Sequence, residues 1–190
     1  MKTLSIIIFG LAALAQWLVP LTGIMQHEQT LAEGTLVKLK CSAPDPYDPL
    51  RGRYLAVRPE QREVSVPAGA KLKRGMQVYA SLSIGTDGLA SVSHLSLEPP
   101  KSGDFIRLKS GYVHNEKTQL EWPFSRFYLN EKLAPEADRW FAENLRSSKG
   151  IIAEVRVLNG RAVLADLSFD GKSFREILKE RESKPRGVVR

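Results

Sequence analysis

The sequence contains few of the residues that build disulfides and metal sites. Cys41 is its single cysteine, and it has three histidines among 190 residues. One cysteine excludes a disulfide within the chain and a zinc site built on cysteines. The histidines, His27, His94 and His114, lie in separate segments without His-x-x-x-His or His-Glu-x-x-His spacing. The sequence therefore predicts no metal site, and we expect no cofactor.

Charge is missing from the N-terminal segment. No charged residue occurs from Thr3 to Met25, a run of 23 residues. At about 1.5 Å per residue such a helix can cross a bilayer core of about 30 Å. The alternative is a cleaved signal peptide, because Ala13-Leu14-Ala15 has the small-x-small cleavage pattern. The apolar run continues past Ala15, which favours an uncleaved anchor over residues 1–25.

The flanks of this segment predict its orientation and the domain boundaries. Lys2 and the terminal amine precede the span, which favours a cytoplasmic N-terminus and a domain on the other side of the membrane. We expect a polar connector at 26–34, one domain at 35–182 and a frayed tail at 183–190.

The net charge of +7 does not indicate nucleic-acid binding. The 28 Lys and Arg residues are scattered among 21 Asp and Glu residues, as in Lys179-Glu180-Arg181-Glu182. No basic run or nucleic-acid motif occurs. We therefore expect no nucleic-acid partner and assign the bilayer as the partner of the N-terminal helix.

Alternation of apolar and polar residues predicts a mainly β domain. Extended segments are expected at 35–41, 53–57, 105–113 and 118–128. In the first of them Cys41 is predicted to be a half-buried small residue and not a reactive nucleophile.

Two further pairs of segments predict β-hairpins. Residues 76–84 and 89–97 flank Thr86-Asp87-Gly88, and residues 151–158 and 161–169 flank Asn159-Gly160, a two-residue turn that accepts positive φ. The resulting fold class is mainly β, a β-rich barrel or curved sheet with one short helix, preceded by a single N-terminal transmembrane helix.

Helical spacing is confined to two later segments of the domain. At 135–147 the apolar residues include Trp140 and Phe141, which we expect to face the core and not a cofactor. Residues 172–181 predict a second short helix.

A Pro- and Asp-rich segment carries a family resemblance. Its residues are Asp45-Pro46-Tyr47-Asp48-Pro49-Leu50-Arg51-Gly52-Arg53-Tyr54. The segment resembles the bacterial family named after its GDYXXLXY motif, in which an N-terminal membrane helix and a strand precede an Asp-Pro-x-Asp loop. Gly52 and Tyr54 match the motif, whereas Arg53, Val57 and Pro59 replace its Asp, Leu and final Tyr. The resemblance implies a membrane-anchored envelope protein, often encoded with multi-pass membrane proteins, and it supplies no catalytic residues.

The same segment supplies the candidate binding residues. Asp45 and Asp48 can cap backbone amides, Gly52 can adopt positive φ, and Arg51 can clamp a carboxylate at two points. Two interpretations stay open for these residues and Tyr54. One is a structural corner between strands, and the other is a binding site.

The functional prediction is a membrane-tethered, non-catalytic domain of the bacterial inner membrane that faces the periplasm and binds a membrane-protein or surface partner. The alternative is a membrane-anchored hydrolase, of the signal-peptidase type or another, with an unrecognised active site. An enzyme of the signal-peptidase type needs a nucleophilic Ser near the membrane and a Lys base. The first Ser after the span is Ser42, and no Ser-x-x-Lys pattern lies near it. We therefore assign no catalytic residue.

Overall fold

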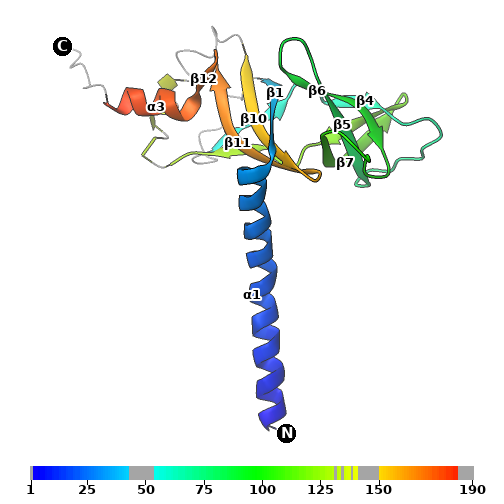
Figure 1. Ribbon diagram of the computed structural model, residues 1–190, viewed down its shortest axis with the longest axis vertical. Coiled ribbons are helices and arrows are strands. Elements are labelled where there is room, and N and C mark those ends of the chain that lie inside the picture. Colours follow the sequence, from blue (N-terminus) through cyan, green and yellow to red (C-terminus); the bar gives the residue numbers. More distant parts are fainter. Residues whose placement is uncertain are drawn as a thin grey trace.

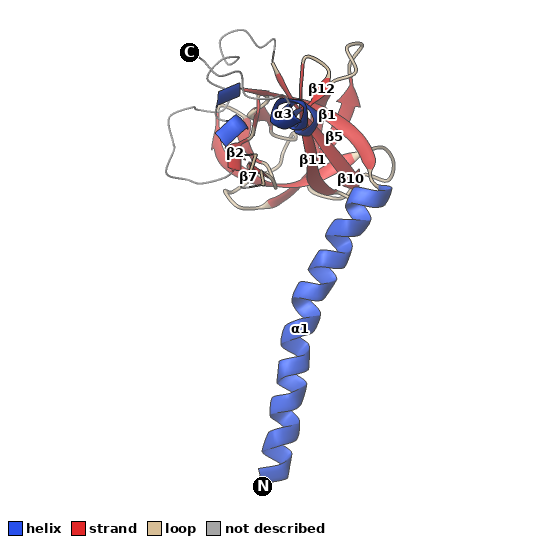
Figure 2. Cartoon of the chain, turned by 90° about the vertical axis from the view of Figure 1, so that its left-hand side faces the viewer, coloured by secondary structure: helices blue, strands red, loops and turns tan. Residues whose placement is uncertain are grey.

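A long helix joins a β-rich domain in the computed structural model of the chain (Figure 1). The structure describes residues 2–42, 54–130, 132–133, 135–137, 139–140 and 150–183. The helix, α1 (Lys2–Glu33), extends away from the domain and leaves the N-terminus at its far end (Figure 2).

The domain that follows consists mainly of strands. They are β1 (Thr35–Ser42), β2 (Tyr54–Ala56), β3 (Arg58–Pro59), β4 (Glu63–Ser65), β5 (Gln77–Ile84), β6 (Ala90–Ser96), β7 (Phe105–His114), β8 (Lys117–Glu121), β9 (Arg126–Tyr128), β10 (Ile151–Leu158), β11 (Arg161–Phe169) and β12 (Lys172–Ser173), followed by the helix α3 (Phe174–Ser183). The mainly β prediction is confirmed.

Helix α1 contains a candidate membrane span at Ile7–Glu33, and the most apolar part of that span is not buried against the domain. Large apolar side chains along it are exposed, among them Phe9, Trp17 and Val19. The polar connector expected at 26–34 is helical as far as Glu33. The helix therefore runs without interruption from its apolar part to the first strand.

The junction between α1 and the domain is closely packed. The Gly34 amide donates a hydrogen bond to the Thr30 carbonyl over 3.0 Å, and Arg156 Nη1 donates one to the Gly34 carbonyl over 2.9 Å. A Cβ at Gly34 would collide with the Thr30 carbonyl oxygen. Thr30 itself is only 1% exposed, and α1 contacts both β10 and β11. The end of α1 is thus part of the domain and not a hinge.

Within the described residues, ten strands form one mixed sheet in the order β12-β11-β10-β1-β6-β5-β7-β8-β4, with β3 paired to β1. Both predicted hairpins are present, because β5 pairs with β6 and β10 with β11 in antiparallel register. Strand β1 joins the part of the sheet that contains β10–β12 to the part that contains β4–β8. It is antiparallel to β10 and meets β6 in parallel at Leu39 and Ala90. Strands β2 and β9 form a separate two-stranded sheet.

The large sheet curves but does not close into a barrel. Its edge strand β4 lies near β6, and the gap between them is bridged by one side chain. Gln61 Nε2 donates to the Val92 carbonyl over 2.9 Å, and the Val92 amide donates to Gln61 Oε1 over 2.7 Å. The Gln61 amide therefore replaces the backbone pairing that a barrel would have here.

The core between β11 and α3 is aromatic. Trp140 packs on Phe169 and Phe174 with ring centroids 4.4 and 5.4 Å apart, which confirms that this residue faces inward. Residues 135–137 and 139–140 are helical, while the rest of the helix expected at 135–147, including Phe141, lies outside the described residues. The second short helix is confirmed as α3.

Candidate functional site

Only one of the predicted binding residues lies in the part of the chain that the structure describes. Asp45, Asp48, Arg51 and Gly52 lie outside it. Tyr54 begins β2 and pairs with Tyr128 of β9. The tail expected at 183–190 also lies outside, except for Ser183 at the end of α3.

Tyr54 belongs to an aromatic and cationic group on the two-stranded sheet. Its ring centroid lies 5.9 Å from that of Tyr128, and the guanidinium carbon of Arg126 lies 4.7 Å from the Tyr54 centroid. A hydrogen bond to the Tyr128 side chain raises the pKa of Arg126 above its ordinary value. Tyr54 is therefore held at the surface and does not point fully inward.

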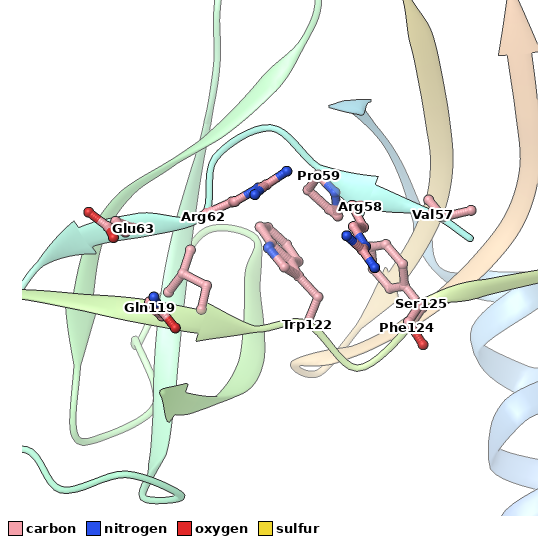
Figure 3. A pocket seen from close by; sticks show the side chains of 10 residues that line it. Val57, Arg58, Pro59, Arg62, Glu63, Gln119, Trp122, Phe124 and Ser125 are labelled. Atoms are coloured by element: carbon pink, nitrogen blue, oxygen red, sulfur yellow. The ribbon is translucent and has the colours of Figure 1, made fainter. Parts of the chain in front are cut away.

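The last three motif positions line an open cleft. Val57 is buried and its amide donates to the Ser125 carbonyl over 2.9 Å, which fixes the chain between β2 and β3. Arg58 and Pro59 follow in β3. The cleft has a volume of about 440 Å³ (Figure 3) and is lined by Val57, Arg58, Pro59, Arg62, Glu63, Gln119, Leu120, Trp122, Phe124 and Ser125.

Aromatic rings form one wall of this cleft. The Trp122 and Phe124 ring centroids are 5.8 Å apart, and Trp122 Nε1 donates to the Gln61 carbonyl over 3.3 Å. Figure 3 shows the Trp122 ring between the side chains of Arg62 and Arg58. The indole is half-buried, so it keeps an accessible surface inside the cleft.

The charge of the cleft is mainly positive. Arg58 and Arg62 are exposed, and Glu63 is the one acidic residue among the described residues that line the cleft. Neither guanidinium forms an ion pair with a described residue. An accessible indole flanked by guanidinium groups can bind an extended peptide segment that carries carboxylates. The indole offers a surface for apolar stacking, and each guanidinium can form two hydrogen bonds with one carboxylate.

Sequence reasoning missed most of this cleft. The sequence pattern predicts a continuous extended segment at 118–128 that includes Trp122 and Phe124, but β8 ends at Glu121 and β9 starts at Arg126. The signal was Pro123, which lacks an amide proton and interrupts a strand. Aromatic residues on both sides of such a break are free to line a cleft.

Cys41 is more deeply buried than predicted. It is 2% exposed, and burial raises the pKa of its thiol from 9.0 to about 12. A protonated, inaccessible thiol is a poor nucleophile. This agrees with the prediction that Cys41 is not reactive.

A serine–histidine contact bears on the hydrolase alternative. Ser81 Oγ lies 3.1 Å from His94 Nε2 across β5 and β6, and Ser93 Oγ lies 3.2 Å from His94 Nδ1. A hydrolase also needs an acid or equivalent group that orients the histidine, and an enclosed substrate site. The second histidine nitrogen meets a serine here, and the pair does not line the cleft. It is an exposed polar contact between neighbouring strands.

No group of three or more His, Cys, Asp or Glu residues in the described ranges is arranged to hold a metal ion.

The fold and the cleft define a class of protein, a β-rich domain carried on one long helix with a candidate membrane span. A family model described as GDYXXLXY protein matches residues 16–167, which cover both the helix end and most of the domain. The chain therefore belongs to the GDYXXLXY family. No curated protein and no solved structure matches it.

Proposed function

We propose that this protein is a membrane-tethered, non-catalytic binding domain of the bacterial inner membrane, with its N-terminus in the cytoplasm and its β-rich domain in the periplasm. Its partner is a multi-pass membrane protein that contacts both the helix and the domain.

The exposed apolar surface of α1 carries this proposal. An isolated helix with this surface is unfavourable in water, because each large apolar side chain left exposed forgoes about 1.5–3 kcal/mol of burial free energy. The stretch from Ile7 to Met25 is about 28 Å long at 1.5 Å per residue, close to the thickness of a bilayer core. Lys2 at its start supports a cytoplasmic N-terminus.

A polar site in the middle of this stretch supports a membrane-protein partner. Gln16 lies halfway between Ile7 and Met25, and its side-chain amide has no hydrogen-bond partner among the described residues. Pro20 lies one turn later inside the helix and has no amide proton, so the Gln16 carbonyl also lacks its usual helical donor. Lipid tails offer no hydrogen bonds, so a neighbouring helix with polar groups would stabilise both.

The cleft supports a second contact outside the bilayer. Its indole and two guanidinium groups lie on the domain that α1 holds beside the membrane. A loop of the same partner with one or more carboxylates would match this charge. Two contacts on one partner reinforce each other, because the first raises the local concentration of the second.

The experiment is site-directed photo-cross-linking in intact membranes. A photoreactive residue replaces Ala13, which lies three residues before Gln16 on the same side of the helix. We expect a covalent product with a multi-pass membrane protein. Gln16→Leu should reduce its yield severalfold, because interhelical hydrogen bonds contribute about 0.6–2 kcal/mol in membranes. Trp122→Ala should also reduce it by removing the extramembrane contact.

Trp17→Leu is the matched control, since it changes the adjacent residue to the same apolar side chain and should leave the yield unchanged. A product formed only with lipid, or only with a second copy of this chain, would contradict a multi-pass partner. Hydrolysis of a peptide by the purified protein would instead support the hydrolase alternative.

A further inference from the structure

A second cavity lies where α1 meets the domain. It has a volume of about 520 Å³ and is lined by residues of α1, β9, β11 and α3, among them His27, Arg126, Tyr128 and Arg175. Figure 1 shows the yellow-green segment that contains β9 beside the upper end of α1. We call this cavity the basal pocket.

The helix fixes the height of the basal pocket. His27 follows Met25, the last residue of the apolar run, by two positions, or about 3 Å along the axis. The headgroup layer on each side of a bilayer core is about 5–8 Å thick. When α1 spans the membrane, as the proposed function requires, the basal pocket lies at the level of the headgroups. The packed junction at Gly34 keeps it there.

Among the described residues, the charged ones that line the basal pocket are basic. Arg126 forms no ion pair with a described residue, and no described carboxylate lines the pocket. Arg175 Nε lies 3.9 Å from Asp166 Oδ1, but the Asp166 carboxylate also accepts hydrogen bonds from Ser173 Oγ and the Leu167 amide. Among the described residues, the Asp166 carboxylate thus partly compensates the charge of Arg175, and no carboxylate compensates that of Arg126.

Aromatic rings hold both arginines in position. The Arg126 guanidinium lies over the Tyr54 ring, and the Arg175 guanidinium carbon lies 5.3 Å from the centroid of Phe127. Such stacking leaves the N–H groups at the edge of the guanidinium available for hydrogen bonds. Arg126 uses part of that edge for the Tyr128 side chain, and the remaining N–H groups can bind a ligand. Guanidinium groups bind phosphate oxygens in two-point fashion.

We propose that the basal pocket binds the phosphate of an anionic phospholipid headgroup, with Arg126 and Arg175 as its ligands. Three features define the site: the height that α1 sets, the two arginines that lie over aromatic rings, and a lining without an acid among the described residues. Tyr54 positions Arg126. Among the predicted binding residues, Tyr54 is the one that the structure describes.

The test is lipid retention by the full-length protein extracted from membranes in mild detergent. The protein is supplied with phosphatidylglycerol or with phosphatidylcholine, and bound lipid is counted by native mass spectrometry. We expect one retained phosphatidylglycerol and no retained phosphatidylcholine. Arg126→Ala with Arg175→Ala should lower retention at least tenfold, and Tyr54→Leu should lower it to a smaller extent.

Arg74→Ala is the control. Arg74 also lies over a tyrosine, with its guanidinium carbon 4.4 Å from the Tyr112 ring centroid, but it does not line the basal pocket. Equal loss in this variant would overturn the site and indicate general surface charge. Displacement of the lipid by millimolar inorganic phosphate would reassign the pocket to a soluble phosphate compound and overturn the lipid assignment.

This test is separable from that of the proposed function. Failure to recover the protein from membranes would contradict the tether itself. Recovery from membranes without selective retention of phosphatidylglycerol would overturn only the headgroup site.

Discussion

At the scale of single residues, Cys41 links burial to a measurable pH dependence. The thiol points inward from β1, and burial raises its pKa from 9.0 to about 12. Between these values the unfolded chain carries a thiolate while the folded chain keeps the proton. Folding then requires proton uptake, so stability falls as pH rises above about 9 and is unaffected by this group at lower pH.

We expect this term to reach about 1.4 kcal/mol at pH 10. The measurement is urea unfolding of the full chain in detergent micelles from pH 7 to 10, with Cys41→Ala as the reference. The reference removes the thiol and leaves the other titrating groups in place, so the stability advantage of wild type should shrink toward alkaline pH. A constant difference between the two curves would contradict the burial of the thiol.

At the same scale, the Asn-Gly turn shows what local sequence determines. Asn159 and Gly160 have φ values of 50° and 78°, which a two-residue hairpin of this type requires. The turn residues, together with the alternating segments on both sides, were therefore sufficient to predict the β10–β11 hairpin. Tyr54 shows the limit, because its contact with Arg126 joins residues far apart in sequence.

At the scale of elements, the strands were predictable and their order was not. Alternation of apolar and polar residues predicts β1, and the side chains of Val37, Leu39 and Cys41 in this strand are buried. Its partner β10 lies near the C-terminal end of the domain sequence and its partner β6 lies well inside it. Pairing across such distances depends on tertiary packing that periodicity does not encode. For the same reason, the sequence did not predict the cleft, which combines β3 with the segment after β8. Of the predicted binding residues that the structure describes, only Tyr54 lies near it in sequence, and Tyr54 does not line the cleft.

The bridge between β4 and β6 also depends on one polar side chain. Gln61→Leu keeps the approximate volume but removes both hydrogen bonds to Val92. Since the Val92 amide and carbonyl would lose their partners in a partly buried position, we expect a loss of about 1–3 kcal/mol in the free energy of unfolding. Urea unfolding followed by circular dichroism measures this loss.

Gln77→Leu serves as the control for this variant. Gln77 Nε2 makes one exposed hydrogen bond, to the Tyr79 hydroxyl over 2.6 Å, so its removal should change stability by at most about 0.5 kcal/mol. Equal effects of the two substitutions would show that the Gln61 bridge contributes nothing specific.

At the scale of the whole molecule, the proposed orientation is open to a direct test. With the N-terminus in the cytoplasm, alkaline phosphatase fused to the C-terminus should be active, because this enzyme forms its disulfides only in an oxidising compartment. A fluorescent protein that matures only in the cytoplasm should be dark at the same position. The opposite pattern would place the domain in the cytoplasm.

Intact-mass measurement of the membrane fraction is the companion control. The mature chain should retain the segment up to Met25, whereas a chain that begins at Gln16 would indicate cleavage after Ala15.

The continuity of α1 with the domain restricts how the cleft can move relative to the membrane, and therefore how it meets a partner. With the helix in the bilayer as proposed, the Gly34 junction removes the tilting freedom that a flexible linker would give. The cleft can then move only by diffusion within the plane of the membrane and by rotation about the membrane normal. A binding loop on another membrane protein meets it by diffusion in a plane, at one height above the lipid surface. Partners of the wrong height are excluded by geometry before any side chain makes contact.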